Sequence, residues 1–235
     1  MTDGNLMAEP VWTPSPERIA ASNLTRFAEF ARARHGAPAG GYPALWRWSV
    51  DEREAFWSAL LEFAEVLCTP GTAPVLQDRD RMPGARWFAD TRLNFAENLL
   101  ARRDDHLAIV FANERGARRE LTFRELHAEV ARVASGLREL GIGPGDRVAG
   151  FVPNLPEAVI AMLATTSLGA AWTSCSPDFG INGVLDRFGQ VAPRVLFTAD
   201  GYFYGGKTLD SLEPIRGVLE KLPSVERVVV IPYVS

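Results

Sequence analysis

The stretch LTFRELHAEVARVASGLRELGIGPGDRVAGFVPNLPEAVIAMLATTSLGAAWTSCSPD, residues 121–178, decides the fold. It predicts a helix, a strand, a second helix and a second strand in that order. Thr122 and Glu125 have the spacing of a capping box at the start of the first helix. One apolar face then recurs at helical spacing, at Leu126, Val130, Val133, Leu137 and Leu140. Gly141 is predicted to end this helix, because a left-handed residue there costs glycine little. Strands that alternate with helices predict parallel strand pairing and helices on both faces of the sheet.

Elements on both sides of this stretch extend the pattern. Upstream, apolar segments flank Glu114–Ala117 and predict a β-hairpin over residues 107–121. Downstream, strands are predicted at 194–198 and 227–231, and helices within 179–193 and 209–222. The predicted fold class is α/β: a helical N-terminal leader, a β-hairpin and the first βα units of a mostly parallel sheet. Its parallel strands are predicted near residues 147, 170, 194 and 227.

Residues 1–105 form a separate, tryptophan-rich leader, which holds five of the six tryptophans. Helices are predicted from Ser15 with a break near Asn23, over Ser49–Leu67 and over Thr91–Arg103, and a loop is predicted at 35–43. Aromatic side chains supply much of the apolar area that proteins bury. We therefore expect the leader to pack on the main domain, residues 106–235. A ligand pocket built from these aromatic side chains is the alternative.

Composition excludes several classes of protein. The net charge is −4, and no block of lysine and arginine occurs, which argues against nucleic acid as a partner. The N-terminus lacks the pattern of a secretory signal, and no apolar run is long enough for a membrane span. Cys68 and Cys175 lie far apart and give no metal-ligand spacing, so we expect a reduced, cytoplasmic protein without a metal site in this chain.

One phosphate-binding pattern occurs by its letters. Residues 201–208, GYFYGGKT, satisfy the P-loop pattern, and they follow a predicted strand and precede a predicted helix. Against a P-loop, Tyr202, Phe203 and Tyr204 are bulky for a loop that wraps phosphates, and the next strand ends in Pro232 rather than in an aspartate that could hold Mg²⁺. The alternative is a solvated glycine-rich loop, residues 199–207, with a surface lysine.

A phosphate site at the ends of the predicted strands does not require a P-loop. Asp178, Asp200 and Lys207 each follow a predicted strand. Ligands of open α/β sheets bind beyond the carboxyl ends of the strands. Loop 199–207 could then offer backbone N–H groups and one ammonium to a phosphate. Composition and periodicity therefore predict a large α/β domain with a candidate phosphate site.

The chain also resembles a known family, the adenylate-forming acyl-CoA synthetases. The motifs that carry the resemblance are LTFREL at 121–126, GIGPGDRV at 141–148 and GAAWTSCSP at 169–177. Within that family the chain is similar to the acetoacetyl-CoA synthetases. The segments that carry this closer similarity are WTPSPERIAASNLTRFAEF, YPALWRWSVDEREAFW, LNFAENLL and SPDFGINGVLDRFGQVAPRVLFTADGYFYGGK.

The resemblance implies a two-step ligase reaction. ATP and acetoacetate would give an acyl-adenylate and pyrophosphate, and the thiol of coenzyme A would then attack the adenylate. It implies ATP, Mg²⁺ and coenzyme A as cofactors and substrates. The ATP, Mg²⁺, acyl and catalytic-lysine sites are expected beyond Ser235, because no position here matches them. The chain stops just after a strand, so we expect the N-terminal portion of a longer enzyme that is inactive alone.

One site implied by the resemblance falls inside the chain. In the related acetyl-CoA synthetases the nucleotide of coenzyme A lies near the loops that match Ser176, Pro177 and Asp178 and Tyr204–Lys207. Lys207 keeps a positive charge that could contact a phosphate. Tyr204 and Asp178 depart from the relatives' residues, and Asp178 would repel a phosphate.

Two other functions remain open on the sequence. The chain could belong to another short-chain acyl-CoA synthetase, acting on acetate, propionate or a hydroxy acid. It could also be a non-catalytic module that binds coenzyme A or a partner protein.

Overall fold

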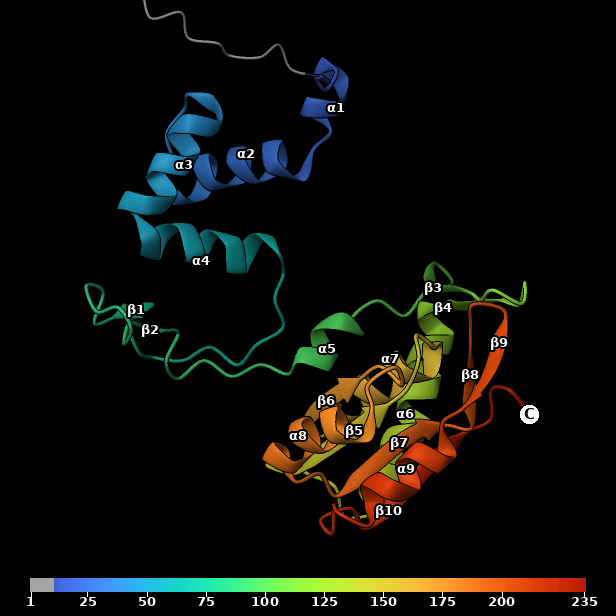
Figure 1. The fold of residues 1–235 in the computed structure, drawn as a ribbon. Coiled ribbons are helices and arrows are strands. Elements are labelled where there is room, and N and C mark those ends of the chain that lie inside the picture. Colours follow the sequence, from blue (N-terminus) through green and yellow to red (C-terminus); the bar gives the residue numbers. More distant parts are fainter. Residues whose placement is uncertain (1–10) are drawn as a thin grey trace, which may run out of the picture. The chain divides into compact units, whose positions relative to one another are not determined.

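The computed structural model describes residues 11–235, which form two compact units divided between Arg92 and Leu93. Figure 1 shows both units. Helix α5 (Phe95–Leu99) belongs to the second unit, whereas the sequence-based boundary after residue 105 assigned it to the leader. The packing of the leader on the main domain stays a prediction.

Over residues 11–92, the first unit contains four helices and a short antiparallel strand pair. They are α1 (Pro16–Ala20), α2 (Asn23–His35), α3 (Gly41–Asp51), α4 (Arg53–Phe63), β1 (Leu76–Gln77) and β2 (Arg86–Trp87). The expected break near Asn23 is confirmed, because the Ser22 hydroxyl accepts a hydrogen bond from the Thr25 N–H and caps α2. The aromatic residues pack on one another inside this unit: Phe27 contacts Phe56 and Phe63, with ring centroids 5.7 and 5.3 Å apart.

The prediction of one helix over Ser49–Leu67 is wrong. Ser49 lies inside α3, where its hydroxyl donates to the Trp46 carbonyl at 2.7 Å instead of capping a new helix. Glu52 is the residue at which the chain turns, with φ −108° and ψ 55°, and α4 begins after it. The serine–glutamate spacing therefore matched a capping box by chance. Helix α3 also begins at Gly41, inside the segment predicted as a loop.

The second unit contains the parallel sheet. Its elements are α5 (Phe95–Leu99), β3 (Leu107–Ala112), β4 (Arg118–Thr122), α6 (Phe123–Glu139), β5 (Arg147–Phe151), α7 (Pro156–Ser167), β6 (Ala171–Cys175), α8 (Ile181–Val191), β7 (Val195–Ala199), β8 (Gly201–Tyr204), β9 (Lys207–Asp210), α9 (Leu212–Leu219) and β10 (Arg227–Ile231). The strand order is β10-β7-β5-β6, and every pairing is parallel. The four predicted parallel strands are confirmed.

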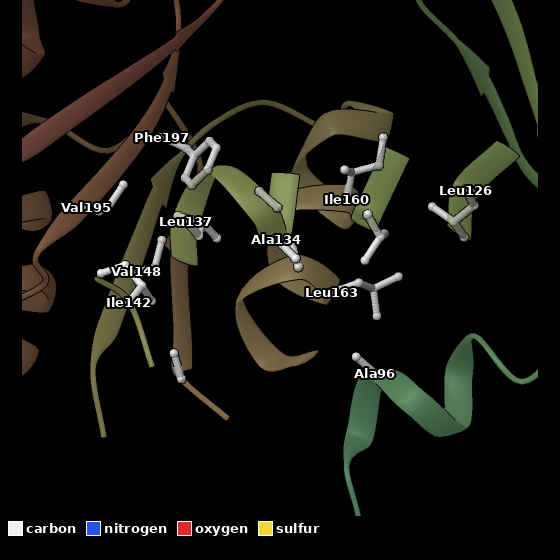
Figure 2. Packing of buried hydrophobic residues seen from close by; sticks show 14 of the residues in the cluster. Ala96, Leu126, Ala134, Leu137, Ile142, Val148, Ile160, Leu163, Val195 and Phe197 are labelled. Atoms are coloured by element: carbon white, nitrogen blue, oxygen red, sulfur yellow. The ribbon is translucent and has the colours of Figure 1, made fainter. Parts of the chain in front are cut away.

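Helices pack on both faces of this sheet. Val148 of β5 and Val195 of β7 share one buried cluster with α6 and α7. The adjacent residues Ala149 and Leu196 share another with α8 and α9. Figure 2 shows the first cluster, in which Leu137, Val148, Val195 and Phe197 lie together. This alternation of faces along each strand is the reason why β5 and β7 are apolar almost throughout.

Helix α6 begins and ends as the sequence predicts. Thr122 and Glu125 form a capping box with both reciprocal hydrogen bonds. Gly141, just beyond the helix, has a φ of +74° and so needs glycine's conformational freedom. The residues of the predicted apolar face are not all buried to the same extent. Leu137 is 2% exposed, whereas Leu140 is 36% exposed.

Two helices are shorter than predicted. The segment Thr91–Arg103 is helical only over α5, which Asn94 caps by accepting a hydrogen bond from the Glu97 N–H at 3.0 Å. The segment Leu209–Leu222 is helical only over α9, because its first residues pair in β9. The Asp210 carboxylate then accepts hydrogen bonds from the Leu212 and Glu213 N–H groups and so fixes the start of α9.

The hairpin β3–β4 is confirmed, and its turn contains Gly116 with a φ of +80°. None of the helices within residues 11–235 is long and apolar enough to span a membrane.

Candidate functional site

A cavity of about 470 Å³ lies beyond the carboxyl ends of β5 and β6. This is the edge of an open parallel sheet where ligands generally bind. Three segments line the cavity: the chain that follows β5, the turn that follows β6, and strand β8. Their lining residues, with Ala158 of α7, are Val152, Pro153, Asn154, Ser174, Cys175, Ser176, Pro177, Asp178, Tyr202, Phe203 and Tyr204.

The structure brings together four of the five residues selected from the sequence. Ser176, Pro177, Asp178 and Tyr204 all line this cavity, although they come from two segments far apart in the chain. Lys207 is exposed and lies opposite Tyr204 in the β8–β9 pairing, but it is not one of the lining residues. The roles given to these five residues stay predictions.

The expected glycine-rich loop at 199–207 is wrong. Residues 201–210 form an antiparallel hairpin, in which Phe203 pairs with Thr208 and Tyr204 with Lys207. Gly205 and Gly206 make its turn, with φ values of +57° and +76°. The segment that matches the P-loop pattern is therefore a strand, a turn and a strand, and its backbone does not wrap around a phosphate.

The hairpin had a sequence signal that was missed. A Gly-Gly pair between two short segments is typical of a two-residue hairpin turn, because both turn residues then need positive φ. The same pattern would have placed Tyr202 and Tyr204 on one face of a strand. Tyr202, Asn154 and Cys175 are among the cavity residues that sequence reasoning did not select.

Asp178 determines the electrostatics of the cavity. It is the single ionisable acid or base among the lining residues apart from the tyrosines and the cysteine. The Ser176 hydroxyl donates to the Asp178 carboxylate at 2.8 Å, which shapes the turn after β6. Burial raises the pKa of Tyr202, and its hydrogen bond to Asp178 and the charge of that carboxylate raise it further. Tyr202 is therefore a neutral hydrogen-bond donor at physiological pH.

Cys175 is not a nucleophile in this arrangement. Its side chain is buried, and burial raises the pKa of the thiol to about 11, with a small opposing effect from Arg187. At neutral pH the group is a thiol rather than the reactive thiolate. The cavity therefore offers binding groups but no activated side chain.

Asp200, the second acidic residue that follows a predicted strand, has a structural role. Its carboxylate accepts backbone hydrogen bonds from Tyr233, Val234 and Ser235 at 2.8, 3.0 and 3.1 Å. Burial works against ionisation of Asp200, but these hydrogen bonds outweigh it and lower its pKa. Asp200 thus holds the chain that follows β10. Within residues 11–235, no three histidine, cysteine, aspartate or glutamate side chains are grouped to hold a metal ion.

Comparison with known proteins agrees with this architecture. The profile of the family described as "AMP-binding enzyme" matches residues 95–235, and that of "Acetyl-coenzyme A synthetase N-terminus" matches residues 42–99. Acetoacetyl-coenzyme A synthetase of Rhizobium meliloti (strain 1021) is 45% identical over 95% of this chain and 34% of the relative. Acetoacetyl-CoA synthetase of Gallus gallus is 38% identical over 97% of this chain and 34% of the relative.

A solved structure has the same fold. Acetoacetyl-CoA synthetase from Streptomyces lividans superposes with a TM-score of 0.91 and 48% identity, over 96% of this chain and 35% of that chain. The resemblance to acetoacetyl-CoA synthetases is thereby confirmed over nearly all of the chain, which spans about a third of the length of these relatives. Since the AMP-binding profile alone covers more than half of the residues, this chain belongs to the AMP-binding enzyme family.

Proposed function

We propose that this chain is the N-terminal portion of an AMP-forming acetoacetate–CoA ligase. The observation that carries the proposal is its similarity to acetoacetyl-CoA synthetases over 95% or more of its length, in sequence and in structure. The complete enzyme would join acetoacetate to ATP with release of pyrophosphate. The coenzyme A thiol would then attack the acyl carbon of the adenylate, forming acetoacetyl-CoA and releasing AMP.

The part of this reaction that we assign to the chain is binding of coenzyme A. The cavity lies at the sheet edge where α/β domains hold ligands, and Ser176, Pro177, Asp178 and Tyr204 line it. Lys207 lies on the neighbouring strand of the hairpin, opposite Tyr204, and its side chain is exposed. We assign its ammonium group to a phosphate of coenzyme A. Asn154 and Tyr202 add neutral hydrogen-bonding groups, which suit the amide, hydroxyl and base portions of such a ligand.

ATP and Mg²⁺ are assigned to residues outside this chain. The described residues contain no cluster of acidic side chains, histidines or cysteines that fits a metal ion. The glycine-containing segment 201–208 is a hairpin and does not fit a triphosphate cradle. We expect the 235-residue chain alone to form no acyl-CoA. A cytoplasmic location is part of the proposal, because the two cysteines are free and the substrates are small soluble molecules.

The test is thioester formation from coenzyme A, ATP and acetoacetate, assayed with this chain and with a ligase of full family length that carries it. Acetoacetate-dependent exchange of pyrophosphate into ATP, measured in parallel, reports the first step without coenzyme A. Activity in the longer protein alone would support the proposal. Activity in the 235-residue chain would place the chemistry in these residues and overturn the assignment of the catalytic groups.

A substrate panel separates the alternatives. Acetate, propionate and 3-hydroxybutyrate should each be used less well than acetoacetate, as judged by kcat/KM. Preference for one of them would assign the chain to another short-chain acyl-CoA synthetase. Binding of coenzyme A by the chain without activity in any longer protein would favour a non-catalytic binding module.

A further inference from the structure

The turns of two hairpins are joined through a single glycine. The Gly206 N–H donates to Glu114 Oε1 at 3.0 Å, and the Gly206 carbonyl accepts from the Arg115 guanidinium at 3.2 Å. Both backbone polar groups of this turn residue are therefore held by consecutive side chains of the β3–β4 turn. Figure 1 shows the two turns side by side, although 91 or more residues separate them in sequence.

The β3–β4 turn is itself fixed in place. Asn113 Oδ1 accepts hydrogen bonds from the Arg115 and Ala117 N–H groups, both at 3.0 Å, in the manner of an Asx turn. Asn113 Nδ2 donates to the Tyr233 hydroxyl, also at 3.0 Å. The Tyr233 ring contacts Phe111 of β3 and Phe203 of β8, with centroids 6.4 and 5.2 Å apart. The groups that hold Gly206 thus rest on a turn with its own hydrogen bonds and ring contacts.

One of these two side chains, that of Arg115, also reaches the wall of the cavity. The Arg115 guanidinium lies over the Phe203 ring, 5.1 Å from its centroid, and also donates to the Thr208 hydroxyl at 3.4 Å. Phe203 lines the cavity between Tyr202 and Tyr204. A two-stranded hairpin has little stability of its own. Contacts from outside are therefore needed to keep β8 in the position in which its tyrosines line the cavity.

We propose that Glu114 and Arg115 are positioning residues for coenzyme A: they clamp the β8–β9 turn and so hold the tyrosine wall of the cavity. This inference rests on the proposed function for its ligand, but the clamp itself does not. Neither residue lines the cavity, so Glu114 acts through Gly206, and Arg115 acts through Gly206 and Phe203, rather than by contact with the ligand.

The charge of Glu114 allows its two possible effects on coenzyme A binding to be told apart. Coenzyme A carries phosphates, and the Glu114 carboxylate is negative. If Glu114 acted only through its charge, its removal would strengthen binding of this anion. If Glu114 acts as a clamp, its removal loosens the hairpin and weakens binding. Glu114→Gln is the matched control, because it removes the charge and keeps an oxygen that accepts the Gly206 hydrogen bond.

The clamp can be tested on the 235-residue chain by proteolysis. The sequence contains two lysines, Lys207 in the hairpin and Lys221 after α9, so a lysine-specific protease has one site under test and one internal reference. In Glu114→Ala, cleavage after Lys207 should rise about fivefold relative to cleavage after Lys221, as expected for the loss of one ordinary hydrogen bond. Glu114→Gln should stay near the unaltered chain. Equal cleavage ratios in all three proteins would overturn the clamp.

The consequence for coenzyme A is tested in the full-length ligase. Glu114→Ala and Arg115→Ala should each raise KM for coenzyme A about fivefold and leave acetoacetate-dependent pyrophosphate exchange unchanged. In a Lys207→Ala background, which removes the hairpin's own phosphate contact, coenzyme A and dephospho-coenzyme A should be affected by the same factor, since a positioning residue does not contact the phosphate. A larger loss for coenzyme A than for its dephospho form would make Arg115 a direct ligand and overturn its positioning role.

The outcomes also separate this inference from the proposed function. If the full-length protein forms no acyl-CoA with any substrate, the ligase assignment fails, whereas the cleavage ratio still decides whether the clamp exists. If the ligase is active but Glu114→Ala lowers KM for coenzyme A, charge rather than position governs this residue and the inference fails while the proposed function stands.

Discussion

The indole of Trp172 lies against the α-carbon of Gly150, across the pairing of β6 with β5. A β-carbon placed on Gly150 would lie 2.5 Å from Trp172 Cζ2 and 2.7 Å from Cη2, which is closer than carbon atoms can approach. The same indole packs on Phe197 of β7, with ring centroids 6.0 Å apart. Gly150 therefore makes room for a side chain that bridges three neighbouring strands.

We expect Gly150→Ala to destabilise the second unit by about 1–3 kcal/mol, because the added methyl group overpacks this contact. Urea unfolding measures the loss of unfolding free energy. Hydrogen exchange of the β5 and β7 amides is a second measurement of the same loss. In a Trp172→Leu background the same change should cost less, which a double-mutant cycle would reveal as coupling. Gly136→Ala is the control: it lies in α6 with nothing within 4 Å of the added carbon and should be neutral or stabilising.

Arg194 joins the amino ends of three strand segments. Its guanidinium lies 3.1 Å from the Asp146 carboxylate before β5 and makes two hydrogen bonds, of 2.8 and 3.0 Å, to Glu226 before β10. The Gly143 N–H and then Arg194 lower the pKa of Asp146, and the hydrogen bond from Arg194 lowers that of Glu226. We expect Arg194→Met to destabilise the sheet at neutral pH.

The pH dependence of this loss has a definite sign. A carboxyl group whose pKa is lower in the folded than in the unfolded state stabilises the fold above its unfolded pKa, and this contribution is lost as the pH falls through its folded pKa. The difference in unfolding free energy between the unaltered chain and Arg194→Met should therefore shrink below about pH 4. Arg216→Met, in an exposed pair with Glu213, should change little at any pH. A loss that is constant with pH would contradict the ion-pair explanation.

Substitution of Leu137 and of Leu140 compares the contribution of a buried and of a partly exposed leucine to stability on one predicted helix face. Both continue the same apolar spacing, yet Leu137 is 2% exposed and Leu140 is 36% exposed. Leu137→Ala should cost about 2–5 kcal/mol of unfolding free energy through lost burial and a residual cavity. Leu140→Ala should cost clearly less, about 1 kcal/mol or below. Similar losses in urea unfolding would show that the end of α6 is packed more tightly than its exposure indicates.

The sequence predicted the sheet because each of its signals is local. The capping box at Thr122 and Glu125, the glycine at 141 and the apolar runs of β5 and β7 all act within one element, and the structure confirms them. It predicted α3 and α4 poorly, because serine–glutamate spacing has the same appearance inside a helix as at its start. The Ser49 hydroxyl can accept from an N–H group that follows it or donate to a carbonyl that precedes it. Packing decides between the two, and the sequence spacing carries no information about packing.

The candidate site was predictable only in part for a related reason. Ser176, Pro177, Asp178 and Tyr204 were selected through the family resemblance, and their meeting at one cavity depends on a hairpin that sequence reasoning took for a loop. The clamp from Glu114 and Arg115 has no local signal at all. It joins two turns more than 90 residues apart, so only the tertiary structure reveals it.

The two cysteines should differ in reactivity. Cys175 is buried with a thiol pKa of about 11, raised by burial from 9.0, so its thiolate fraction at pH 8 is about a hundredfold lower than that of an ordinary thiol. Cys68 is half-buried. A colorimetric thiol reagent should label one cysteine quickly in the folded chain and two after denaturation, and Cys68→Ser should abolish the quick reaction. Rapid labelling of Cys175 in that variant would show that the end of β6 opens readily.

Lys207 and Asp178 should affect coenzyme A in opposite directions in the full-length ligase. Lys207 pairs with the cavity residue Tyr204 in the β8–β9 hairpin, and Asp178 supplies the carboxylate that lines the cavity. Lys207→Ala should raise KM for coenzyme A about fivefold, which corresponds to one exposed ion pair, and should affect dephospho-coenzyme A less. Asp178→Asn should lower KM, because it removes a negative charge from the neighbourhood of the phosphates.

The matched control is Lys221→Ala, which removes the other lysine of the sequence from an exposed position after α9. It should leave KM for coenzyme A unchanged, so that a general effect of net charge is separated from a local contact. Both effects should weaken at high salt, since exposed charges are screened over about 10 Å at 0.1 M salt. If Lys207→Ala behaves like Lys221→Ala while Asp178→Asn raises KM, the phosphates lie away from the hairpin. The carboxylate of Asp178 then accepts hydrogen bonds from an uncharged part of coenzyme A.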